Sequence, residues 1–315
     1  MSGRAARGVV TRLHIEGTLI LETPANLGSG DSVGLTDIPL LLDPLSNERP
    51  LLTGTSIAGA LRSYLREFEH GYGHPGSAND LANSLFGRVQ KETSYQSWLL
   101  VDDALGETPG IELRDGVAID ARTRTAAEDK KYDVSLLEAG STFPLSMELL
   151  LPRTRDEAQN SRLMEALGIA LRGLQAGEIG LGLRKRRGLG RCRVEQWRVR
   201  RYDLRSAEGL MGWLDDDHSV EATGADITQL LAVSPPRRDA RHEFVIEATF
   251  NLESSLLIRS GSGEANSPDM VHLRSRRRNG LRPVLSGTSL AGAVRGRALR
   301  IANPMLGREA GADLV

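Results

Sequence analysis

The stretch Leu51–Leu65 reads LLTGTSIAGALRSYL, and a closely similar stretch, VLSGTSLAGAVRGRAL, begins at Val284. A shift of 233 residues places Gly54-Thr55-Ser56 on Gly287-Thr288-Ser289. The same shift places Arg62 on Arg295. An internal repeat of this kind indicates that one structural unit is written twice in the chain.

The repeat extends upstream into an alternating apolar pattern, with an offset of 231 residues. The apolar positions of the first copy are Leu13, Ile15, Leu19 and Leu21, and those of the second are Phe244, Ile246, Phe250 and Leu252. Alternation with a period of two predicts a half-buried strand in each copy. Glycine- and serine-rich text follows both strands, so each copy reads strand, loop, short strand, helix.

The helix after Gly54 is predicted to be amphipathic. Its apolar residues share one face, and they are Ile57, Leu61, Tyr64, Leu65 and Phe68. Thr55 or Ser56 is expected to cap the helix, and the glycine before them would let a phosphate approach the helix N-terminus. An ordinary capped helix packed on a sheet explains a single copy equally well, but two copies with matched arginines favour a ligand.

The rest of the first copy continues the alternation of strands and helices. Strands are predicted at 97–105, at 142–151 and at 192–202, and a second amphipathic helix at 161–177. A polar insertion, Val117–Thr142, separates the two β-α-β halves. This order predicts an α+β, ferredoxin-like fold, the arrangement that RNA-recognition domains also use. We expect a complete domain over residues 1–205, a linker over 206–241 and the start of a second domain over 242–315.

Composition narrows the class of protein. The 315 residues are 40% hydrophobic, contain no run of about 18 apolar residues and begin without the apolar core of a signal peptide. A single cysteine, Cys192, excludes an internal disulfide and a cysteine-cluster zinc site. The plain interpretation is a cytoplasmic protein that makes no membrane contact.

Charge is unevenly distributed, although the net charge is only −1. Nine basic residues and one acidic residue lie between Arg184 and Arg201, and a second basic cluster spans Arg274–Arg282. Such clusters are either solvated surfaces or local sites for an anionic polymer. Because only 4% of the residues are aromatic, stacking of RNA bases on a sheet fits poorly. Binding would then depend on phosphates held by arginines and by loop amides.

Other motifs are missing or ambiguous. The glycines of GLGLRKRRGLGR follow a helix and precede a strand, which is not the context of a dinucleotide fingerprint, and no phosphate-binding loop of the GxxxxGK[ST] type occurs. No pair of histidines has convincing metal spacing. Asp37 precedes the first glycine-capped helix, and Asp269 has nearly the same place in the second copy, with one extra residue between it and the helix. Such a carboxylate would hold Mg²⁺ or position a proton at a phosphodiester, or it would simply cap its loop.

Taken together, the Gly-Thr-Ser-x-x-Gly-x-x-Arg helix start, the LFG at 85–87, the aspartate in TDIPLLLDPL and the GLGLRKRRGLGR loop resemble the CRISPR-associated RAMP superfamily. The nearest resemblance is to the backbone subunit of type III (Csm/Cmr) effector complexes. It covers 11–204 almost fully and 243–301 as the beginning of a second unit. Backbone subunits of this kind polymerise along a CRISPR RNA together with other subunits of the complex.

The resemblance implies specific roles. The insertion would be a thumb that kinks the duplex of guide and target RNA, and Asp37, with a divalent metal such as Mg²⁺, would cut the target RNA. Asp269 is the corresponding candidate in the second copy, across a gapped alignment. The residues implied to contact RNA are Gly54, Thr55, Ser56, Arg62, Arg122, Arg124, Gly180, Gly182, Arg184, Arg187, Gly188, Gly190, Ser289 and Arg295.

The second copy departs from the family pattern, because it contains no second thumb, second helix or second glycine-rich loop. A half-unit exposes a sheet edge and an apolar face, so we expect either a fragment of a tandem fusion or a partner that completes the fold. The second half is then expected to be poorly ordered. Three functions remain open: a guide-directed endoribonuclease, a non-catalytic RNA-binding scaffold, and an RNase that processes the guide.

Overall fold

The computed structural model describes residues 8–28, 39–46, 48–89, 94–120, 123, 125–153, 157–234, 238–260, 271–277 and 279–307. Its centre is an antiparallel sheet with the strand order β12-β11-β1-β10-β6. The strands are β1 (Val9–Leu21), β6 (Leu99–Val101), β10 (Thr142–Pro152), β11 (Cys192–Asp203) and β12 (Ala222–Gly224). The helices of this part are α1 (Gly54–His70), α2 (Leu81–Phe86) and α3 (Glu157–Gln175). Without β12, the order is that of a ferredoxin-like fold.

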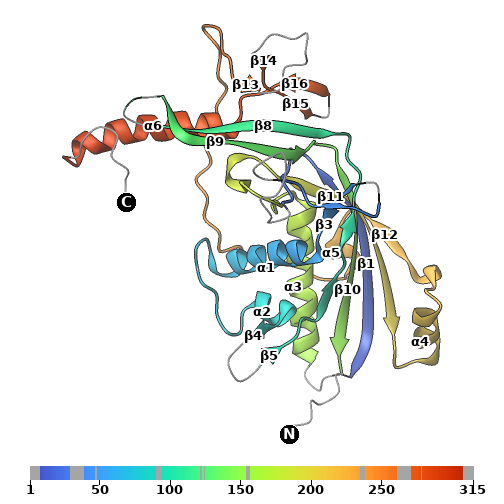
Figure 1. Ribbon diagram of the computed structural model, residues 1–315. Coiled ribbons are helices and arrows are strands. Elements are labelled where there is room, and N and C mark those ends of the chain that lie inside the picture. The colour runs from blue at the N-terminus through green and yellow to red at the C-terminus, as the bar shows by residue number, and fades with distance from the viewer. Residues whose placement is uncertain are drawn as a thin grey trace.

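Strand β1 has the alternation that its sequence predicts. Leu13, Ile15, Leu19 and Leu21 are at most 1% exposed and face the core beneath α1 and α3. The residues between them lie on the opposite, open face of the sheet, where Arg12 contacts Glu148 of the neighbouring β10 at 2.9 Å. The core is therefore a single layer between the sheet and its helices (Figure 1).

Helix α1 begins as predicted at Gly54, but its cap is Thr53 rather than Thr55 or Ser56. The Thr53 hydroxyl accepts a hydrogen bond from the Ser56 backbone N–H at 3.3 Å. The five apolar residues predicted for its inner face are all buried. The cap lies two positions before Thr55 because Gly54 already has helical backbone, so the last extended residue is Thr53.

A long hairpin is inserted between the two β-α-β halves and projects beyond the sheet (Figure 1). It consists of β8 (Ile111–Ile119) and β9 (Ala126–Leu137), so it begins earlier than the predicted insertion. The remaining short strands of the first copy are β2 (Leu42–Asp43), β3 (Arg49–Leu52), β4 (Arg88–Val89), β5 (Ser94–Tyr95) and β7 (Ala104–Leu105), and Figure 1 shows β4 and β5 beside α2, away from the hairpin. The base of the hairpin is fixed by the reciprocal backbone hydrogen bonds of Ala25 and Leu137.

The segment expected to be a linker, 206–241, contains regular structure along much of its length. Its elements are α4 (Ala207–Leu214), η2 (His218–Val220), β12 and α5 (Ile227–Leu230). Strand β12 pairs with β11, while Ile227 of α5 is buried in the core of the first copy. This segment therefore packs on the first copy.

Past this segment, Arg241 anchors the chain to the helices of the first copy. Its guanidinium lies 4.6 Å from the Tyr64 ring centroid and 2.6 Å from a Glu178 carboxylate oxygen. Burial, together with the hydrogen bond to Glu178, raises the pKa of Tyr64. The Ala240 N–H adds a hydrogen bond to the Phe68 carbonyl at 2.8 Å.

The second copy differs from the expectation for its first strand, because residues 244–258 have no regular secondary structure. The elements that follow are β13 (Arg259–Ser260), β14 (Val271–His272), β15 (Arg274–Arg277), β16 (Gly280–Pro283) and α6 (Gly287–Met305). Phe244, Ile246, Phe250 and Leu252 are between 68% and 91% exposed. The alternating pattern is present, but none of the described strands pairs with it, so the segment stays open to solvent.

Candidate RNA interface

The glycine-rich loop after α3 has a backbone that only glycine adopts readily at several positions. Gly182, Gly188 and Gly190 have φ values of 81°, 80° and 72°, in the left-handed region. A Cβ at Gly182 would lie 2.2 Å from the Asn26 carbonyl oxygen, and one at Gly190 only 1.8 Å from that of Leu181. The glycines therefore fold the loop tightly back on the first copy and present the residues between them.

Those residues carry a concentrated positive charge. A single turn, η1 (Lys185–Arg187), follows Arg184, whose guanidinium lies 4.3 Å from the Tyr132 ring centroid on β9. Lys185, Arg186 and Arg187 are exposed, and within the described residues no ion pair joins them to a carboxylate. The loop is thus fixed to the hairpin at Arg184 and at Leu189, which packs on Val134 and Leu136 of β9, and it leaves three cations available to an anion.

The start of α1 is shaped mainly by packing. A Cβ at Gly54 would lie 2.1 Å from the Val101 carbonyl oxygen, and the Gly54 N–H donates to the Asp103 carboxylate at 2.7 Å. This amide is therefore already occupied, which weakens the expectation of a phosphate at Gly54. Thr55 and Ser56 are exposed, and Arg62 donates to the Asn83 side-chain oxygen at 2.7 Å.

The glycine-rich loop and the start of α1 are connected through a short path of backbone contacts. Residue Gly182 packs on Asn26, the Leu41 N–H donates to the Leu27 carbonyl, and the Leu51 N–H donates to the Leu41 carbonyl. Since Leu51 lies three residues before Gly54, this path leads from one predicted RNA-binding motif to the other along the same end of the fold.

Four predicted site residues lie outside the described residues: Asp37, Asp269, Arg122 and Arg124. Their roles stay predictions. Among the residues that the structure does describe, no group of three or more histidine, cysteine, aspartate or glutamate side chains could hold a metal ion. The proposed Mg²⁺ site at Asp37 is therefore not tested by this geometry.

In the second copy, Ser289 lies at the start of α6 and donates its N–H to the Ser286 hydroxyl at 3.1 Å. Arg295 lies on the exposed part of the helix. A Cβ at Gly287 would lie 2.3 Å from the Arg187 carbonyl oxygen, so α6 begins directly against the glycine-rich loop of the first copy. The structure thus brings the second helix start to the first copy's loop.

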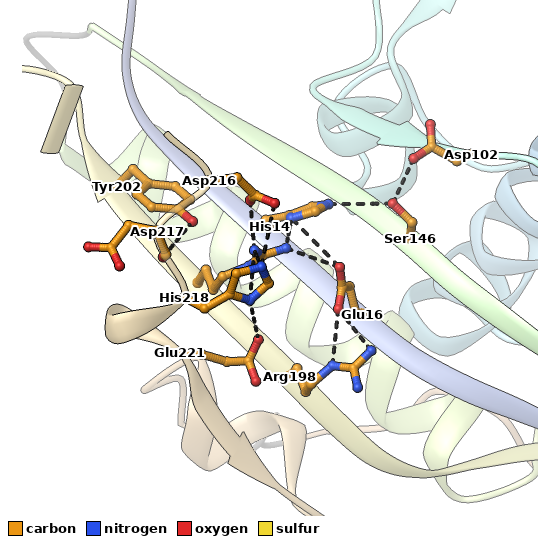
Figure 2. A network of polar contacts seen from close by, with 11 residues as sticks. His14, Glu16, Asp102, Ser146, Arg198, Tyr202, Asp216, Asp217, His218 and Glu221 are labelled. Atoms are coloured by element: carbon orange, nitrogen blue, oxygen red, sulfur yellow. Dashed lines mark hydrogen bonds and ion pairs between the residues drawn. The ribbon is translucent and has the colours of Figure 1, made fainter. Parts of the chain in front are cut away.

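Sequence reasoning missed a polar network on the open face of the sheet (Figure 2). Its centre is Arg200 on β11, which is only 2% exposed and donates to His14 and Glu16 of β1. Arg200 also contacts Asp216 at 2.7 Å and the ring of His218 at 3.0 Å, both from the segment 206–241. His14 Nε2 lies 3.4 Å from the Ser146 hydroxyl, which donates to Asp102 at 2.6 Å.

This network contains the serine, histidine and aspartate of a hydrolase triad, but the hydrogen bond between His14 and Ser146 runs in the wrong direction for catalysis. Because Arg200 donates to His14 Nδ1, the neutral imidazole carries its proton on Nε2, facing Ser146. The histidine therefore donates to the serine and does not remove its proton. The network is structural: through Asp216 and His218 it holds the segment around η2 on the sheet. Its signal in the sequence is a few charged residues and a histidine on the outward face of two distant strands, and it is visible only once the strands are paired.

The fold and the loop together define an α+β, ferredoxin-like protein with a basic, glycine-rich surface loop. The chain belongs to the RAMP superfamily, whose family model matches residues 10–193, more than half of the sequence. Proteins of this family work in CRISPR-associated, RNA-binding complexes with other subunits. No curated protein matches the sequence. None of the described helices is both long enough and apolar enough to cross a membrane.

Proposed function

We propose that this protein is a backbone subunit of a type III (Csm/Cmr) CRISPR effector complex, that it acts in the cytoplasm, and that it holds CRISPR RNA along its phosphate backbone. The observation that carries the proposal is the loop 184–191, where Lys185, Arg186 and Arg187 are exposed, form no ion pair with any described carboxylate, and lie on a glycine backbone that is tightly fixed. Phosphate contacts by arginine and by loop amides give affinity without reading sequence. A subunit that must hold guides of many sequences needs this property.

The hairpin β8–β9 supports the same proposal. It projects beyond the sheet, and Tyr132 on β9 packs against Arg184 of the loop. A hairpin in this position is suited to act as the thumb that kinks the guide–target duplex beside the bound guide. The second copy would then be the start of a second RAMP unit in a tandem arrangement.

We further propose that target RNA, once paired to the guide, is cut with Asp37 as the key carboxylate and a divalent metal such as Mg²⁺. Asp269 is the corresponding candidate in the second copy. A bound metal would supply a polarised phosphate and an activated water. The competing function is an RNA-holding scaffold in which neither aspartate is active, and the guide-processing RNase is the weakest of the three.

Binding is tested by fluorescence anisotropy of the full chain with a labelled single-stranded RNA at several salt concentrations. Contacts to about five phosphates predict a log–log salt slope of roughly −3 to −4. Replacing Arg187 by Gln should weaken binding to unrelated RNA sequences by the same factor. A flat salt dependence would contradict recognition of the backbone.

Cleavage is tested separately with the assembled complex of guide, target RNA and the other subunits. Loss of cleavage in Asp37→Ala, with guide binding retained, is the expected result for the endoribonuclease. Asp43→Ala is the matched control, since Asp43 lies nearby in sequence and has no acidic counterpart in the second copy. Cleavage that is undiminished in Asp37→Ala excludes that residue, and a wild-type complex that binds target without cutting supports the scaffold.

A further inference from the structure

Two neighbouring cavities lie where the second copy meets the glycine-rich loop of the first. One has a volume of about 320 Å³ and is lined by Arg186 and Arg187 of the loop, Arg114 of β8 and Arg277 of β15. The other, of about 410 Å³, is lined by Arg191, Arg277 and Arg282. Arg277 belongs to both, so the two cavities adjoin. Neither copy forms either cavity alone.

This junction is held by specific contacts. The Ser275 hydroxyl on β15 donates to the Glu112 carboxylate on β8 at 2.9 Å, and Arg276 forms an ion pair with Glu138 at the base of the hairpin. Ser275 is fully buried. On the other side, the start of α6 is in contact with the Arg187 backbone, as its glycine requires. The contact between the second copy and the first therefore brings the arginines of β15 and β16 next to those of the hairpin and the glycine-rich loop.

Positive charge in the cavities exceeds the negative charge around them. Arg114 is paired with Glu112, and Glu22, the one acidic residue among the described residues that line the second cavity, is paired with Arg193. Within the described part of the chain, no ion pair joins Arg186, Arg187, Arg191, Arg277 or Arg282 to a carboxylate. Burial, and to a smaller extent the neighbouring Arg114, lower the pKa of Arg277. Arginines gathered in this way repel one another unless an anion lies between them.

We propose that the paired cavities are one composite site for two successive phosphodiester groups of a single-stranded RNA, bridged by Arg277. The inference rests on the proposed guide-binding function and assigns to the second copy a part in it. Two adjoining cavities that share one arginine match a chain of phosphates better than a single small anion. Arg277 Nη1 already donates to the Ser275 hydroxyl and to the Arg276 carbonyl, which fixes the guanidinium at the junction. The remaining N–H groups of the planar fork, on Nε and Nη2, suit the bridge between two phosphate oxygens.

The test is a double-mutant cycle on the full chain, with a labelled oligouridine RNA as the probe. Arg187→Gln and Arg277→Gln should each weaken binding by about tenfold at low salt, and each should reduce the salt slope by about 0.7. If both arginines hold the same segment of RNA, the double variant should lose less than the product of the two single losses. Arg274→Gln is the matched control, because Arg274 is on the same strand as Arg277 but lines neither cavity.

Each outcome decides the question. Wild-type binding that is weakened by Arg277→Gln and Arg282→Gln, but not by Arg274→Gln, supports the composite site. Equal binding by the Arg277→Gln and Arg274→Gln variants overturns it while the proposed function stands. Wild-type protein that does not bind the RNA at all removes the proposed function and the site with it. Thermal unfolding of every variant, with an unchanged Tm expected, separates loss of contact from loss of fold.

Discussion

The two copies of the repeat have the same apolar pattern and opposite environments. In the first copy, Ile15 is fully buried, and in the second, its counterpart Ile246 is 78% exposed. The first strand lies between β10 and β11, both of which come from later in its own unit. The second has no such neighbours among the described strands. A hydrophobic pattern thus specifies which face a strand will bury, but the burial itself depends on strands that are far away in the sequence.

The first glycines of α1 and α6 also have the same sequence context and different neighbours. A Cβ added at Gly54 would lie 2.1 Å from the carbonyl oxygen of Val101, and one added at Gly287 would lie 2.3 Å from that of Arg187. The first glycine packs α1 on its own sheet. The second packs α6 on the loop of the preceding copy. The same Gly-Thr-Ser helix start therefore packs inside one copy at α1 and forms the contact between the two copies at α6.

The largest effect should come from truncating the matched isoleucines. Ile15→Ala removes buried methyl groups and should lower the free energy of unfolding by about 2–5 kcal/mol. Ile246→Ala should change it by no more than about 0.5 kcal/mol, because that side chain is already in water. Urea unfolding of the two variants measures both values. Comparable losses would show that 244–252 is buried in solution.

The next effect concerns Arg200, whose network has no counterpart in the second copy, where Val245 replaces His14. Arg200→Met leaves Glu16 and Asp216 without their shared donor and should cost about 3 kcal/mol, since the guanidinium is buried. The segment 206–224 should become sensitive to proteolysis. The control is Arg201→Met at the exposed neighbouring position, which should change neither the stability nor the sensitivity of 206–224 to proteolysis.

Substituting the matched glycines should separate the two packing roles. Gly54→Ala forces α1 away from β6 and should cost about 2 kcal/mol of global stability. Gly287→Ala should leave the free energy of unfolding of the first copy unchanged. Because the added methyl group pushes α6 off the glycine-rich loop, amide hydrogen exchange in α6 should become faster. Equal global losses from both variants would mean that the two copies unfold as one cooperative body.

The smallest effect is expected at the helix caps. Thr53→Ala removes the cap of α1 and should cost about 1 kcal/mol, detectable as a lower Tm. Ser286→Ala removes the equivalent cap of α6, and its effect should be confined to faster exchange in the first turn of that helix. A Tm lowered to the same extent by Ser286→Ala would contradict the independence of the second helix.

The sequence predicted the elements whose signals are local. The β-α-β order, the inner face of α1 and the glycine-rich loop follow from periodicity and from glycine spacing, and the structure contains all three. The cap at Thr53 was missed because three hydroxyl residues, Thr53, Thr55 and Ser56, lie within four positions, and only the backbone decides which one is last before the helix. Strand β12 lies in a polar segment with no alternation, so its pairing with β11 left no local signal. The composite cavities depend on contacts between residues more than 80 positions apart, such as Arg187 and Gly287.

The pairing of β12 with β11 has a consequence for how such units join. Strand β12 covers the β11 edge at Trp197–Val199, and at the opposite side of the sheet β6 offers only three residues. A neighbouring strand therefore finds little backbone at the β6 edge, and it finds a ladder interrupted by β12 at the β11 edge. The second copy is attached instead through a hairpin base, a loop and a helix start. The second copy is thus joined by surface docking, so its position is set by side chains at the joint and its strands remain separate from the sheet of the first copy.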